Sequence, residues 1–60
     1  MINTVVRFEN DMVLVFDEKG KQLPEYQGRY TKVKTKILAH APLSAEFFHG
    51  IWHRVSRKVW

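Results

Sequence analysis

The sequence predicts a small α+β fold in the order β-β-α-β: an N-terminal hairpin and a third strand in one sheet, with one helix packed on it. Three observations support this prediction. Two segments rich in Val and Phe, TVVRF and MVLVF, flank a short polar stretch, as in a hairpin. Apolar residues recur at helical spacing through residues 30–40. An aromatic segment, FFHGIW, then favours a strand.

The hairpin is predicted to turn through a two-residue loop at Asn10-Asp11, because both residues tolerate positive φ. This register places four apolar side chains on one face, which is the predicted core face: Val6, Phe8, Val13 and Val15. The other face of the second strand carries Met12, Leu14 and Phe16. A strand that is apolar on both faces usually lies inside a sheet rather than at its edge.

Residues 17–28 are predicted to form turns and loops. Gly20 suits the left-handed conformation of a turn within DEKGK. Pro24 lacks a backbone N–H and cannot donate to a sheet ladder, so QLPEYQG is expected to be a loop or a short edge segment.

The segment 30–40 fits two patterns. As a helix it aligns Tyr30, Val33 and Ile37, and Pro42 then ends it. As a strand it would place its β-branched residues on one face and its three lysines on the other. The helix is preferred, because a hairpin needs a cover for its apolar face.

The segment 46–53 is also ambiguous. A helix would gather Phe48, Ile51 and Trp52 on one side, but Gly50 in its middle would cost about 1 kcal/mol relative to Ala. We therefore expect a strand near 46–53 and a basic C-terminal tail over 54–60. The alternative fold makes the C-terminal half two helices, in the order β-β-α-α. The predicted core is Val6, Phe8, Val13, Val15, Val33, Ile37 and Phe47 or Phe48.

Length and composition limit the possible functions. The chain has 60 residues, which suits one domain, and no cysteine, so disulfides and thiol chemistry are excluded. No apolar run approaches the roughly 20 residues of a membrane span, and the N-terminus does not resemble a secretory signal. A cytoplasmic protein without membrane contact is expected. Neither Ser44 nor Ser56 lies in a catalytic motif, so no enzyme, cofactor or small-molecule substrate is expected.

Positive charge is concentrated in the second half of the chain. Residues 1–30 carry four basic and five acidic side chains, whereas residues 31–60 carry six basic and one acidic. Nucleic-acid binding needs cations for phosphates and aromatic rings for bases. The candidates for such a site are Lys32, Lys34, Lys36, Arg54, Arg57, Lys58 and Trp60.

His49 and His53 are weak candidates for a metal site. On a helix their Cβ atoms would lie about 6 Å apart, close enough to share one ion. On a single strand the same spacing is about 13 Å, which is too far. Two histidines would also need a third ligand, such as His40 or Glu46, so metal binding by this pair is only a minor alternative.

The second strand also predicts an interaction surface. A helix that covers one sheet face leaves Met12, Leu14 and Phe16 on the other, with Trp52 nearby in the predicted third strand. We therefore expect a non-enzymatic interaction module that binds a protein partner or itself through these residues. Nucleic-acid binding through the basic residues is the alternative hypothesis.

Overall fold

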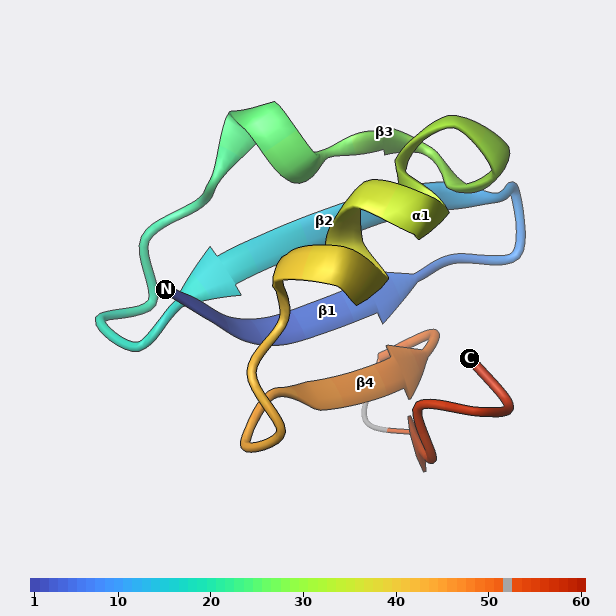
Figure 1. Cartoon of the computed structure of the whole chain (residues 1–60). Coiled ribbons are helices and arrows are strands. Elements are labelled where there is room, and N and C mark those ends of the chain that lie inside the picture. Colours follow the sequence, from blue (N-terminus) through green and yellow to red (C-terminus); the bar gives the residue numbers. More distant parts are fainter. Residues whose placement is uncertain (52) are drawn as a thin grey trace.

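The N-terminal hairpin forms the middle of a five-stranded mixed sheet in the computed structural model, which describes residues 1–51 and 53–60. Strands β1 (Ile2–Arg7) and β2 (Met12–Asp17) pair antiparallel, and β4 (Glu46–His49) runs parallel to β1. The short strands β3 (Gly28–Arg29) and β5 (Arg54–Val55) form the edges, giving the order β3-β2-β1-β4-β5 (Figure 1). The predicted α+β class is confirmed.

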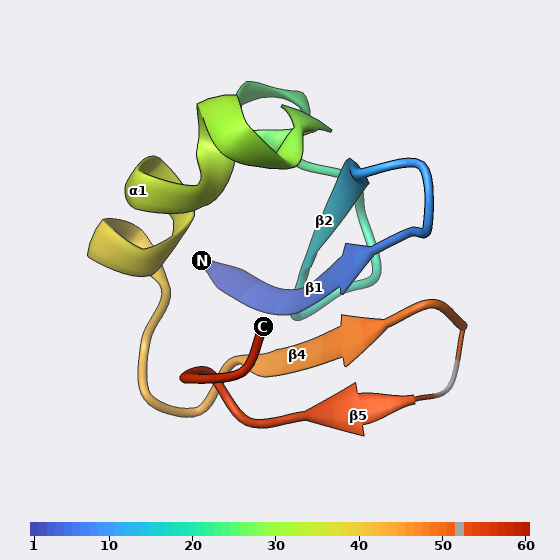
Figure 2. The same cartoon turned by 90° about the vertical axis from the view of Figure 1, so that its right-hand side faces the viewer.

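Helix α1 (Tyr30–His40) has the bounds predicted from the sequence and lies on one side of the sheet (Figure 2). Val33 and Ile37, four residues apart on one side of the helix, are its buried residues. Its first residue, Tyr30, donates its backbone N–H to the Asp11 carbonyl over 2.7 Å. A short 3-10 helix, η1 (Pro24–Tyr26), and strand β3 occupy the segment predicted as loop or edge.

The predicted hairpin register is wrong by one residue. The loop has three residues, because Phe8 N–H donates to the Met12 carbonyl and Asp11 N–H donates back to the Phe8 carbonyl, each over 2.9 Å. Asp11 takes a left-handed φ of 66°, as expected at the end of a three-residue loop. Val15 therefore pairs with Val5 instead of Val6, which moves the side chains of Thr4 to Arg7 on β1 to the opposite face.

The core lies between the sheet and α1. Its buried apolar side chains are Ile2, Val5, Val13, Val15, Val33, Ile37, Phe47 and Trp60. The sequence predicted five of these correctly but placed Val6 and Phe8 there as well; both are half-buried on the other face of the sheet. A register shift between Ile2 and Thr4 lets Ile2 and Val5 both face the core although they are three residues apart.

The C-terminal segment differs from the predicted tail. Strand β4 ends at His49, where Gly50 has a positive φ of 68°, and the chain returns antiparallel as β5. Trp60 is only 2% exposed, and its ring packs edge-on against Tyr30 and Phe47 with centroids 5.1 Å away in each case. Residues 54–60 fold back because the last residue is a large aromatic that completes the core.

Candidate functional site

The sheet face that points away from α1 forms a shallow apolar groove of about 300 Å³. We call this surface the open face. It is lined by Thr4, Val6, Phe8, Leu14, Phe16, Phe48 and Ile51. None of these lining residues is charged, and Thr4 alone has a side-chain hydroxyl.

The pairing of the three longest strands brings the apolar side chains of the open face together around Val6. Val6 on β1 stands between its antiparallel partner Leu14 on β2 and its parallel partner Phe48 on β4. Thr4 stands between Phe16 on β2 and Glu46 on β4, so a carboxylate lies next to the apolar side chains at this end. Because neighbouring strands lie about 4.8 Å apart, these side chains touch across strands and form one surface.

The described residues include no helix or loop that covers the open face. Figure 2 shows α1 and the C-terminal end together on the opposite side of the sheet. At the ends of the open face, Ile51 is 68% exposed and Met12 is 41% exposed. Single exposed apolar residues are common on proteins, but a contiguous apolar face is not.

Two of the four predicted interface residues line the open face: Leu14 and Phe16. Met12 precedes them on the same side of β2, and Trp52 falls outside the described residues. The sequence did not predict that Val6, Phe8 and Phe48 belong to this face. The tolerance of Asp11 for positive φ fits both a two-residue and a three-residue loop, and the three-residue loop that forms reverses β1.

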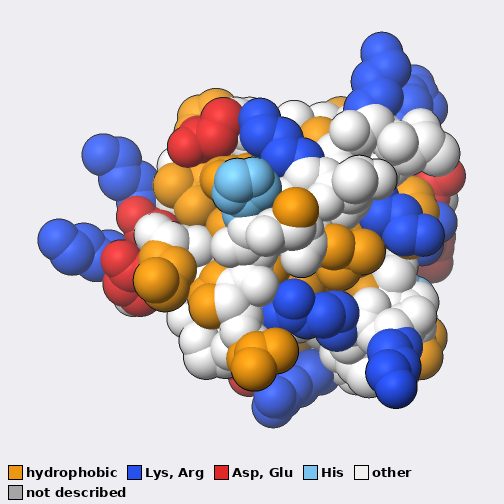
Figure 3. Space-filling model, viewed as in Figure 1, with side chains coloured by type: hydrophobic (Ala, Val, Ile, Leu, Met, Phe, Trp, Pro, Cys, Tyr) orange, Lys and Arg blue, Asp and Glu red, His pale blue; other side chains and the backbone are white. Residues whose placement is uncertain are grey.

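The helical lysines lie on the other side of the molecule. Lys32, Lys34 and Lys36 are exposed on α1, where their i, i+2, i+4 spacing spreads them around the helix. Lys36 Nζ donates to the Glu25 carbonyl over 2.8 Å. On the α1 side of the molecule, Lys and Arg side chains are separated by apolar and neutral ones and form no continuous patch (Figure 3).

Three of the other nucleic-acid candidates, Arg54, Arg57 and Trp60, pair or pack with residues of the fold itself. Arg54 forms an ion pair with Glu46 over 3.2 Å. Arg57 donates to the carbonyls of Ala41, over 3.1 Å, and Pro42, just past the C-terminus of α1. Trp60 is buried and therefore offers no face on which a base can stack. Lys58 is exposed.

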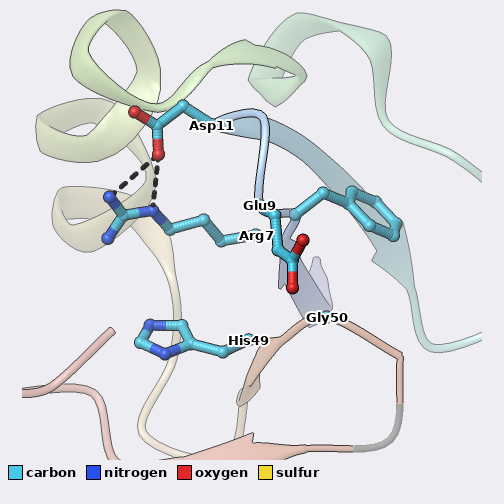
Figure 4. A pocket seen from close by; sticks show the side chains of 6 residues that line it. Arg7, Glu9, Asp11, His49 and Gly50 are labelled. Atoms are coloured by element: carbon cyan, nitrogen blue, oxygen red, sulfur yellow. Dashed lines mark hydrogen bonds and ion pairs between the residues drawn. The ribbon is translucent and has the colours of Figure 1, made fainter.

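A polar pocket of about 390 Å³ lies at the end of the hairpin, where Arg7 joins several elements (Figure 4). Arg7 Nε and Nη2 donate to Asp11 Oδ1 over 3.2 and 3.0 Å, and Nη1 donates to the Trp60 carbonyl over 3.0 Å. The guanidinium carbon also lies 3.5 Å from the centre of the Tyr30 ring. Through these contacts Arg7 connects the hairpin loop, the start of α1 and the C-terminal segment, which is a structural role.

The two candidate metal ligands flank the turn between β4 and β5. His49 N–H donates to the His53 carbonyl over 2.9 Å, so neither a helix nor a single strand describes their spacing. His49 Nε2 lies 3.3 Å from the Trp60 carbonyl oxygen, and His53 is exposed. Within residues 1–51 and 53–60, no group of three His, Cys, Asp or Glu side chains is placed to hold a metal ion.

No family model matches this chain, and neither a curated protein nor a solved structure is similar to it. In the described part of the chain, no helix has the length and apolar character needed to cross a membrane.

Proposed function

We propose that this protein is a small non-enzymatic interaction module that associates with a protein surface, its own included, through the open face. One observation carries the proposal: the central strands of the sheet present a contiguous, uncharged apolar surface that no described element covers. Contiguous apolar patches on the surface of small domains often mark protein interaction sites.

The energetic argument follows from the area of apolar surface. Removing apolar surface from water is favourable by about 25 cal/mol per Å². A side chain such as Phe16 or Phe48 is already packed against its neighbours in the sheet, so it needs little further ordering when a partner covers it. Binding therefore loses less conformational entropy here than at a flexible loop.

Nucleic-acid binding, the alternative predicted from the sequence, has less support. Arg54 and Arg57 already have partners within the fold, and the ring of Trp60 is buried. Among the described residues, the aromatic rings next to the exposed lysines of α1 are Tyr26 and Tyr30. Both rings are half-buried, so they offer little surface on which a base could stack. The cytoplasmic location also stays a prediction from the sequence.

Site-specific photo-cross-linking in cells that express the chain tests the proposal. A photoreactive phenylalanine analogue replaces Phe16 or Phe48 on the open face, and the control replaces Lys32 on α1. We expect protein cross-links from the two face positions and few from position 32. Equal cross-linking at all three positions, or none from the face, would contradict the proposal. Cross-links from position 32 to nucleic acid would support the alternative instead.

A further inference from the structure

We infer that the partner of the open face is an amphipathic helix of another protein, with an apolar stripe along its length and acidic side chains on the flank that faces Arg29. This inference rests on the function proposed above and names the kind of surface that binds. Binding then follows the general mode in which an amphipathic helix lays its apolar stripe into an apolar groove.

The width of the apolar surface matches one helix. Its lining residues come from three neighbouring strands, β2, β1 and β4, and from the residues that follow β1 and β4. Three strands at about 4.8 Å spacing span about 10 Å, which is close to the diameter of an α-helix with its side chains, about 10–12 Å. A wider partner would also have to cover the charged residues on either side of these strands.

The length of the surface suits a helix of a few turns. Met12 and Phe16 are four residues apart on β2, and this spacing corresponds to about 13 Å along the strand. A helix covers about 13 Å with about nine residues, because it rises about 1.5 Å per residue. Over this length, apolar residues spaced three or four apart place about three side chains on the groove.

The opposite face of the same strands shows that their geometry accommodates a helix. There the buried side chains of β1, β2 and β4 pack beneath α1, and Trp60 completes the cover. Helix α1 contributes two buried residues, Val33 and Ile37, which are one turn apart. A partner helix on the open face would repeat this packing and enclose the sheet between two layers of helix.

The charged residues at the two margins specify the flanks of the partner helix. Beyond β2, Arg29 on β3 stands beside Met12, and no described residue forms an ion pair with it. Beyond β4, Arg54 on β5 stands beside Phe48 and is paired with Glu46 over 3.2 Å. Arg29 therefore favours a carboxylate on the nearer flank of the helix, whereas the Glu46–Arg54 pair presents both charges and favours neither.

This charge requirement distinguishes the partner from helix α1 of a second copy. Helix α1 carries Lys32, Lys34 and Lys36 and no acidic residue, so it would bring like charges towards Arg29. Weak self-association of the purified chain at high concentration is compatible with the inference, because a second copy can cover an apolar surface when no such helix is present.

Photo-cross-linking from two positions on β2 tests the inference in cells that express the full chain. A photoreactive phenylalanine analogue replaces either Met12 or Phe16, and mass spectrometry locates the partner residue joined to each. For a helix that lies along β2, we expect the two partner residues in one segment, about 7 to 9 positions apart. An extended strand in the same place would separate them by about four positions.

Variants of Arg29 test the acidic flank of the helix. Arg29→Glu, combined with the analogue at position 16, should lower the cross-linking yield about 5-fold, because an attractive contact at the margin becomes repulsive. Arg29→Lys should retain most of the yield. The matched control Lys32→Glu, on the other side of the sheet, should leave the yield unchanged. Arg29 and Lys32 are both exposed, and circular dichroism checks that every variant is folded.

The remaining outcomes separate this inference from the proposed function. Partner residues about four positions apart, scattered over several segments, or within a second copy of this chain would overturn the helix and leave the proposed function in place. A yield that does not respond to Arg29→Glu would overturn the acidic flank. No protein cross-link from either position would overturn the inference and the proposed function together.

Discussion

Arg7 shows how one charged residue can belong to the interior of a small sheet. Val6 and Phe8 lie on the open face, so in the observed register alternation places Arg7 on the helix side. There its guanidinium stacks on Tyr30 and donates to Asp11 and to the Trp60 carbonyl. These contacts connect the hairpin turn, the start of α1 and the C-terminal segment.

Replacing Arg7 with Met should lower the free energy of unfolding by about 1–3 kcal/mol. Methionine preserves much of the apolar stem but removes the stacked cation and its hydrogen bonds, each of which contributes on the order of 1 kcal/mol. Urea unfolding measures the change. The control is Arg54→Met, which breaks the surface ion pair with Glu46 and should cost less than about 1 kcal/mol. Equal losses in the two variants would contradict the role given to Arg7.

Asp17 makes the stability of the protein depend on pH. Backbone N–H donation from Lys21, assisted by that from Lys19, both over 2.9 Å, lowers the pKa of its carboxyl below the usual 3.8. The ionised form is thus favoured in the folded state, and its stabilisation is complete above the unfolded pKa. That stabilisation is lost as the pH falls from near 3.8 through the lower folded pKa.

The variant Asp17→Asn should therefore show a weaker loss of stability in acid. Asparagine retains a side-chain oxygen that can accept from the turn but carries no titrating carboxyl. Urea midpoints measured in steps from neutral pH to below 3.8 should fall less for the variant than for the wild type. Parallel pH profiles would show that Asp17 does not cause this dependence.

At the scale of elements, the hairpin shows that the sequence identified its two strands but not the face of β1 that is buried. Alternating apolar residues identified both strands, but β1 and β2 each have apolar residues on both faces, so alternation did not decide which face is buried. The turn decides it: Asp11 at φ 66° makes a three-residue loop, and Val5 then pairs with Val15. Leu14 and Phe16, predicted to face away from the core, do lie on the open face. Val6 and Phe8 were placed in the core instead, because the predicted register reversed β1.

The C-terminus of α1 depends on a residue distant in sequence. The sequence predicted where the helix ends, because Pro42 cannot continue it, but gave no sign of a partner for the carbonyls that follow the helix. Arg57 supplies that partner by donating to the carbonyls of Ala41 and Pro42. Its guanidinium carbon also lies 5.1 Å from the centre of the Phe47 ring.

Replacing Arg57 with Ala should cost about 1–3 kcal/mol, because it leaves these carbonyls without their charged donor. For a domain of this size, each kcal/mol corresponds to about 4–8 °C in the melting temperature, which calorimetry resolves. The matched control is Lys58→Ala at the neighbouring exposed position, for which we expect a change within about 0.5 kcal/mol. A larger loss for Lys58→Ala than for Arg57→Ala would contradict this account.

At the scale of the whole molecule, the core closes only when the chain end returns. The sequence predicted the helix over 30–40 from its helical spacing and the need to cover the hairpin, and the strand after it from its aromatic and β-branched composition. It did not predict that Trp60 enters the core, since one aromatic residue after RVSRKV has no periodic pattern to place it. The buried position depends on Tyr30 and Phe47, which the fold brings together from distant parts of the sequence.

The same arrangement gives the molecule two unlike faces of its sheet. One face is covered by α1 and Trp60, and the other is the open face. Because none of the residues that the structure describes covers the open face, we expect it to be buried against another molecule. The central claim is therefore that association takes place through the open face and leaves the helix side unchanged.

Methyl-resolved NMR of the purified chain, recorded from about 50 μM to about 1 mM, tests this claim most directly. We predict that the methyl signals of Val6 and Leu14 on the open face shift with concentration. Those of Val33 and Ile37, buried beneath α1, should stay fixed and serve as internal controls. Shifts confined to residues of α1, or no shift of Val6 and Leu14 across the whole range, would contradict the account.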